Sequence, residues 1–325
     1  MPNKSTRTVW VALAADLGVG LAKAGAAVLT RSAAMAAEAS HSLADVATGV
    51  ILVVAQRRST RDRDDQHPLG YGREIYFWTL LAALSVLVAG AVFSLREGIE
   101  ELIHPSVTSR FTVAYVVLAI ATGLDLISFR QSAGQMSIQA RRRHLSLLDQ
   151  SKSTSDPSLR TVFVQDVVSV SGDVMAFAGL VINQITGSSI PQGIVAVLIG
   201  LLLIRAGFRL VQRSHDFLVG AWSLALPDLK VREADDSTQP FQPSDEEGLR
   251  TFLLGYPGVT AIRELLVTFL GPGRVWVIVH LEINNNLRGD QVTSLVRGID
   301  SGLRHESEYI YRVDVVPIAG AKDVP

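Results

Sequence analysis

Cysteine is absent from this chain of 325 residues, which excludes disulfides and thiolate metal ligands. Any transition metal would therefore be held by nitrogen and oxygen atoms. Charged residues are also scarce, at 19% of the chain, whereas a soluble domain carries about a quarter. The net charge of -1 and the lack of a clustered basic patch give no indication of nucleic-acid binding. The scarcity of charge over the first two thirds of the chain indicates a helical membrane domain.

Long apolar stretches take the place of the missing charges. A membrane-spanning helix needs about 20 apolar residues, and stretches of this length occur at roughly 8–30, 32–56, 76–98, 111–132, 158–183 and 190–212. The first is too long for the apolar core of a signal peptide, and no small-residue cleavage site follows it. We therefore expect an α-helical membrane protein with six transmembrane helices, the first of them retained.

Basic residues in the short loops predict the orientation of these spans. One side of the membrane carries most of them, namely Lys4, Arg7, Arg57, Arg58, Arg61, Arg63, Arg73, Arg141, Arg142, Arg143, Lys152 and Arg160. The opposite side carries only Arg31, Arg96 and Arg110. Because loops rich in Lys and Arg stay in the cytoplasm, we expect a multi-pass protein of the cytoplasmic (inner) membrane with both termini in the cytoplasm.

The composition changes after Arg213 to that of a soluble domain. We expect a transmembrane domain over 1–215 and a cytoplasmic domain over 216–325, with a polar linker at 216–243. The pattern of apolar and turn-forming residues in the second domain predicts a helix, two strands, a helix and a strand, at Glu246–Leu254, Thr260–Phe269, Val275–Ile283, Gln291–Arg304 and Tyr309–Val316. This order indicates a small α+β open sheet with helices on one face.

Seven of the ionisable side chains inside the predicted spans are candidates for a functional site, namely Asp16, Lys23, His41, Asp45, Asp125, Asp166 and Asp173. Each is costly in hydrocarbon, so each is expected to serve a function or to have an internal partner. Asp16 and Lys23 lie seven residues apart on one face of the first span. We expect them either to form an ion pair with each other or to pair with residues of other helices.

His41 and Asp45 are the most informative of these residues. Their four-residue spacing puts them on one helix face, where an imidazole nitrogen and a carboxylate oxygen suit a zinc-like ion. The alternative is a hydrogen bond between the two that only orients a helix. Asp166 in the fifth span supplies a candidate third ligand at a compatible depth. Asp173, two turns further out on the same face, either marks an exit path or pairs helices.

The segment between the second and third spans joins Asp64 and His67 to a turn rich in glycine and proline. Acidic residues beside a histidine could gather metal near a cytoplasmic entrance. The alternative, which composition favours, is a solvated charged turn shaped by Pro68, Gly70 and Gly72.

Two of these motifs together resemble the cation diffusion facilitators. The motifs are His41-Ser-Leu-Ala-Asp45 and His67-Pro-Leu-Gly-Tyr-Gly-Arg-Glu74. The stretches Val164-Gln-Asp166 and Gln184-Ile-Thr-Gly187 resemble the subgroup related to animal zinc transporter nine. The resemblance implies a homodimer, proton-coupled export and a ferredoxin-like cytoplasmic domain. It also implies a transport site at His41, Asp45 and Asp166.

The chain departs from the family pattern at several positions. Val162 stands where many zinc transporters of the family have His or Asp. The fourth ligand is therefore open, with water and Asp16 as candidates, and Asp125 and Asp173 are further accessory candidates. Tyr71 replaces a histidine of a loop site, so we expect weak or no metal binding at Asp64 and His67. His280 is a lone histidine on a strand, which we interpret as a structural residue.

The sequence as a whole predicts a dimeric exporter of a divalent, zinc-like metal in exchange for protons. Iron, cobalt, manganese and cadmium also suit a site of nitrogen and oxygen ligands. The transported metal, the protons and the lipid bilayer are the expected partners, without a bound cofactor. Two alternatives remain, a membrane metal sensor or scaffold of the same fold that does not transport, and a membrane metallohydrolase.

Overall fold

The computed structural model describes residues 4–142, 146–147, 151, 156–220, 246–307 and 309–319. The chain divides into two compact units, which are described separately. The first contains residues 1–58, 74–151 and 157–215, and the second contains 216–325 together with 59–73 and 152–156. The 59–73 segment, expected as a loop of the membrane domain, therefore groups with the second unit.

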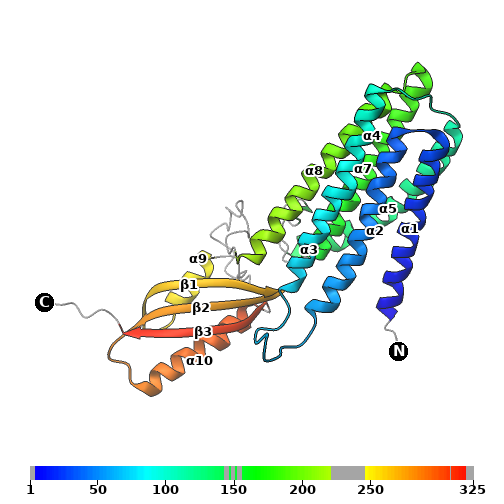
Figure 1. The fold of residues 1–325 in the computed structure, drawn as a ribbon. Coiled ribbons are helices and arrows are strands. Elements are labelled where there is room, and N and C mark those ends of the chain that lie inside the picture. Colours follow the sequence, from blue (N-terminus) through cyan, green and yellow to red (C-terminus); the bar gives the residue numbers. More distant parts are fainter. Residues whose placement is uncertain are drawn as a thin grey trace. The chain divides into compact units, whose positions relative to one another are not determined.

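Long helices make up the first unit, and Figure 1 shows them in blue to green, largely side by side. They are α1 (Lys4–Thr30), α2 (Ala33–Ser59), α3 (Glu74–Ser85), α4 (Val92–Ile103), α5 (Phe111–Arg142), α7 (Pro157–Thr186) and α8 (Ile190–Leu218). A π-helical stretch, Val86–Ala91, joins α3 to α4. Such a stretch widens one turn of a helix without ending it.

Five helices of the described chain are long and apolar enough to cross a membrane. They are Ala33–Ser59, Glu74–Ile103, Phe111–Ile138, Pro157–Thr186 and Ile190–Leu218. These confirm five of the six predicted spans. The remaining prediction, 8–30, lies within the continuous helix α1, and that α1 also crosses the membrane stays a prediction.

Small residues allow α4 and α8 to approach closely. A Cβ placed on Gly98 of α4 would lie 2.7 Å from the backbone nitrogen of Val197 and 2.8 Å from the carbonyl oxygen of Gly193, both on α8. No side chain fits between backbones at that distance. Helices in membranes are held together largely by such close packing, because lipid is as apolar as their side chains.

We therefore expect Gly98→Ala to destabilise the membrane unit by about 1–3 kcal/mol, the usual cost of forcing extra atoms into a packed core. Gly123→Ala is the matched control, since a Cβ on Gly123 of α5 meets nothing within 4 Å. Unfolding of both variants in mixed micelles would measure the difference. Equal stability of the two variants would contradict this account of the α4–α8 contact.

The second unit contains a three-stranded sheet in the order β1-β2-β3. Its elements are α9 (Glu246–Leu254), β1 (Val259–Gly271), β2 (Arg274–Ile283), α10 (Gly289–Glu306) and β3 (Ile310–Ala319). The β1 and β2 strands pair antiparallel, and β2 and β3 pair parallel. All five elements predicted for this domain are confirmed, with ends that differ by a few residues.

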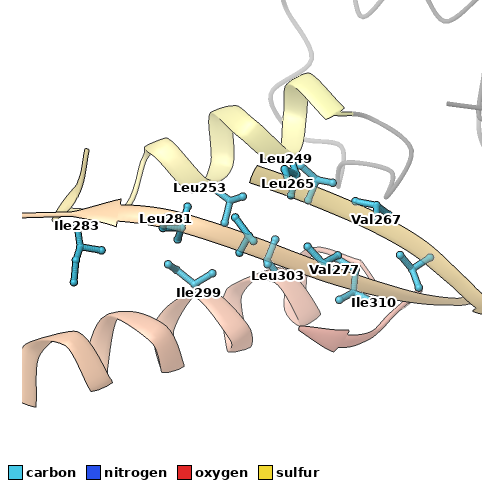
Figure 2. Packing of buried hydrophobic residues seen from close by; sticks show 12 residues of the cluster. Leu249, Leu253, Leu265, Val267, Val277, Leu281, Ile283, Ile299, Leu303 and Ile310 are labelled. Carbon is cyan, nitrogen blue, oxygen red and sulfur yellow. The ribbon is translucent and has the colours of Figure 1, made fainter. Parts of the chain in front are cut away.

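One face of the sheet carries the core of this unit. Alternate residues of β2, from Val275 to Ile283, are buried. They pack with Leu249 and Leu253 of α9 and with Ile299 and Leu303 of α10, as Figure 2 shows. Both helices therefore contribute to one core. Alternation along a strand sends the intervening side chains to the other face.

His280 is one of these intervening residues. Its Nδ1 lies 3.2 Å from Oε2 of Glu264, its cross-strand neighbour on β1. Asp314 of β3 accepts a hydrogen bond from the indole of Trp276 on β2. These pairings agree with a structural role for His280.

Candidate functional site

A polar contact between α2 and α7 lies inside the apolar helix bundle. Nε2 of His41 is 3.4 Å from Oδ2 of Asp45 and 3.0 Å from the hydroxyl of Ser169. The Ser169 hydroxyl is also 3.2 Å from Oδ2 of Asp45, and Gln165 donates a hydrogen bond of 2.6 Å to Oδ1. Two side chains from each helix thus meet in one hydrogen-bonded group.

Helix periodicity places these four groups opposite one another. His41 and Asp45 are four residues apart on α2, and Gln165 and Ser169 are four apart on α7, so each pair shares a helix face. His41 is only 1% exposed. Its Nδ1 has no hydrogen-bond partner among the described residues. The other ring nitrogen, Nε2, is the one beside the Asp45 carboxylate, and a buried imidazole nitrogen next to a carboxylate oxygen suits a zinc-like ion.

Asp166, the predicted third ligand, lies in a different environment. It accepts a hydrogen bond of 2.8 Å from Ser128 and another from Ser132, both on α5. Within the described residues, no three His, Asp or Glu side chains are close enough together to hold a metal ion. The structure thus brings together His41 and Asp45 but directs Asp166 toward α5.

The geometry of α7 explains this separation. Successive residues of an α-helix are turned by roughly 100°. Gln165 faces Asp45, so its neighbour Asp166 faces a different helix. Asp16 of α1, an accessory candidate, is within electrostatic range of both Asp45 and Asp166.

A second cluster of charged residues in the bundle lies around Lys23. Its ammonium lies 3.0 Å from Glu38, 2.7 Å from Asp173 and 3.6 Å from Asp125. The prediction that Asp16 pairs with Lys23 is therefore wrong, and for Lys23 the alternative, pairing with other helices, is the one observed. The contact with Lys23 also shows Asp173 pairing helices, whereas no observation places it on an exit path.

Sequence reasoning missed several members of these groups. Glu38 was not counted among the ionisable residues of the spans, although it lies one helical turn before His41. Asp125, Ser128 and Ser132 follow one another at spacings of three and four residues. This polar stripe in an apolar helix was the available signal for a face directed toward the bundle interior.

Hydrogen bonds within the loop engage both carboxylate oxygens of Asp64. Asp64 accepts bonds from the Tyr71 hydroxyl at 2.6 Å and from the His67 backbone at 2.7 Å, and it lies 3.0 Å from His67 Nδ1. The Tyr71 hydroxyl, followed by His67, holds the pKa of Asp64 below its ordinary value. Weak or no metal binding in this loop stays a prediction.

Comparison with known proteins gives a consistent result. Residues 9–219 match the model of the cation efflux transmembrane domain. The human proton-coupled zinc antiporter SLC30A9, a mitochondrial protein, is 25% identical over 248 residues, covering 76% of this chain and 40% of that relative. Metal tolerance protein C4 of Arabidopsis thaliana is 28% identical over 216 residues, covering 66% of this chain and 47% of the relative.

A bacterial relative matches over a larger share of its length. The metal cation efflux system protein CzcD of Cupriavidus metallidurans is 25% identical over 283 residues, covering 86% of this chain and 77% of the relative. By contrast, the chain spans less than half the length of the SLC30A9 proteins and of metal tolerance protein C4.

Proposed function

The chain belongs to the cation efflux family, a family of membrane transporters rather than enzymes, and on that premise we propose that it exports a divalent metal ion in exchange for protons. The α2–α7 contact of His41, Asp45, Gln165 and Ser169, in which His41 and Ser169 are buried, is the observation that carries the proposal. The relatives named as a proton-coupled zinc antiporter and as a metal efflux protein support it. The membrane metallohydrolase alternative has no support from this family.

The proposed transport site consists of His41, Asp45 and Asp166. Metal binding would require Asp166 to leave the serines of α5 and reach the α2 face. A rotation or tilt of α7 would achieve this, and it would move Gln165 away from Asp45 at the same time. The hydrogen-bonded arrangement with Gln165 and Ser169 is then one state of the cycle, and the arrangement with Asp166 turned toward α2 is another.

Proton exchange follows from the chemistry of these ligands. A metal binds neutral imidazole and ionised carboxylate, so its arrival displaces protons from the site. Protonation from the opposite side of the membrane then weakens the ligands and releases the metal. The cycle couples metal export to a proton gradient through the same side chains.

Zinc is the metal that we propose first. A site with one imidazole and two carboxylates, and without thiolate, suits zinc and also accepts iron, cobalt, manganese or cadmium. Asp16 or a water molecule is the candidate fourth ligand, because Val162 has no donor atom.

Several features of the whole protein belong to the same proposal. They are a sixth span formed by α1, a homodimer, and a ferredoxin-like fold for the second unit, whose αββαβ order and single core support it. We also propose that the protein lies in the cytoplasmic membrane with both termini in the cytoplasm, on the basis of its basic loops. The named mitochondrial location belongs to the SLC30A9 relatives.

The test is transport by purified protein in liposomes. With an outward-directed proton gradient imposed, we expect zinc to accumulate in the vesicles and protons to leave them, both faster than in protein-free vesicles. A protonophore should abolish this accumulation. Zinc binding without any zinc movement would contradict export and would favour the sensor or scaffold alternative. The hydrogen bonds of Asp166 to the serines of α5 also fit that alternative.

A further inference from the structure

The cluster around Lys23 joins four helices inside the membrane unit. Lys23 comes from α1, Glu38 from α2, Asp125 from α5 and Asp173 from α7. The side chains of Lys23, Glu38 and Asp173 are completely buried, and that of Asp125 is 24% exposed. Among the described residues, His41 and Asp45 are also within electrostatic range, both from the transport-site side.

The charges of this cluster do not balance. One ammonium faces three carboxyl groups, which would leave a net charge of -2 if all three were ionised. An uncompensated charge in a low-dielectric interior is costly, and buried groups avoid that cost by changing their protonation. Carboxyl groups that share a buried site behave in this way, because a retained proton removes the repulsion between them.

The arrangement of the carboxyl groups points to the same conclusion. Glu38 and Asp173 both accept a hydrogen bond from the Lys23 ammonium, at 3.0 and 2.7 Å, and Asp125 lies 3.6 Å from it, so the three carboxyl groups are gathered around one atom. A hydrogen bond between two carboxyl groups requires a proton on one of them. In addition, Glu38 Oε1 and Asp173 Oδ2 are buried without a hydrogen-bond donor among the described residues. A proton shared within this group would provide the missing donor.

The ligand that suits the cluster is a proton and not a second metal ion. The Lys23 ammonium already lies 2.7–3.6 Å from an oxygen of each carboxyl group, so it takes the place that a metal cation would occupy. The backbone of α7 leaves no spare room either, because a Cβ on Gly172 would collide with Glu38 Oε1.

We propose that Lys23, Glu38, Asp125 and Asp173 form a second proton-binding site of the transport cycle, separate from His41 and Asp45. The proposal rests on the proposed function for its coupling to metal. Glu38 lies one turn before His41 on α2, and Asp173 lies one turn after Ser169 on α7. A movement of α7 that brings Asp166 to the metal therefore also separates the carboxyl groups. The separated groups are rehydrated and lose the shared proton.

The first test is infrared spectroscopy of the purified protein in lipid. At neutral pH we expect a carbonyl stretch of a protonated carboxylic acid, which Asp173→Asn and Glu38→Gln each weaken or remove. Glu101→Gln is the matched control and should leave the band unchanged. Glu101 is also buried, but the backbone and hydroxyl of Ser106 satisfy it with hydrogen bonds of 2.9–3.1 Å. A wild-type spectrum without the band, or a band that survives in both cluster variants, would overturn the proposal.

The second test measures coupling. In liposomes, we expect Asp173→Asn or Glu38→Gln to lower the number of protons moved for each zinc ion, whereas Glu101→Gln should not. A ratio unchanged in both cluster variants would overturn the coupled role. The infrared measurement does not depend on transport, so a protein that shows the band but moves no zinc would refute the proposed function alone.

Discussion

Zinc-dependent proton flux is expected to disappear when Asp45 is replaced by Asn. Asp45 accepts hydrogen bonds from Gln165 and Ser169 and lies 3.4 Å from His41, so it is at the centre of the α2–α7 contact. Asparagine keeps the size of the side chain but removes its charge, and a neutral amide is a poor ligand for zinc. The expected loss exceeds the roughly 10–100-fold that follows from losing a hydrogen-bond partner of a ligand.

Two serines of α7 allow variants with a smaller expected loss of flux, and with none, to be compared with Asp45→Asn. Ser169→Ala removes a partner of both His41 and Asp45, so the flux should fall by about 10–100-fold. Ser171→Ala is the matched control, because Ser171 is exposed and, among the described residues, its hydroxyl bonds to the carbonyl of Val167 in its own helix alone. Initial rates of zinc and proton movement in liposomes would measure all three variants. Undiminished flux in Asp45→Asn would refute the proposed transport site.

Replacing Lys23 by Met is expected to destabilise the membrane unit by about 3–5 kcal/mol, the cost of leaving one side of a buried ion pair without its partner. Methionine matches lysine in length but carries no charge. Glu38 and Asp173 would then lose a completely buried cation at 3.0 and 2.7 Å. Because the cluster joins four helices, the loss should weaken the whole bundle rather than one contact.

Unfolding in mixed micelles would measure this change. An exposed ion pair supplies the control, since Arg96 and Glu100 are 3.8 Å apart and largely exposed, and Arg96→Met should cost at most about 1 kcal/mol. The double variant with Lys23→Met and Asp173→Asn should recover part of the loss, because it removes one of the uncompensated carboxylates. If Lys23→Met lowered the free energy of unfolding no more than Arg96→Met does, the stabilising role of the buried cluster would be contradicted.

Local sequence patterns predicted most of the fold. The length of the apolar stretches identified five confirmed spans, and period-two alternation in Val275–Ile283 identified the central strand of the small sheet. Both patterns reflect constraints within a single element, namely the thickness of a bilayer and the pleat of a strand. The grouping of the 59–73 segment with the second unit was not predictable in this way, because it depends on contacts between distant residues.

For the candidate site, the sequence alone determined that His41 and Asp45 share a helix face, because a spacing of four residues is about one helical turn. Only the tertiary structure decided which neighbours complete each group. It placed Gln165 and Ser169 opposite that face, turned Asp166 toward Ser128 and Ser132, and gave Lys23 to Glu38 and Asp173 instead of Asp16. The rotation of one helix against another comes from the packing of many side chains, which no spacing within a single helix records.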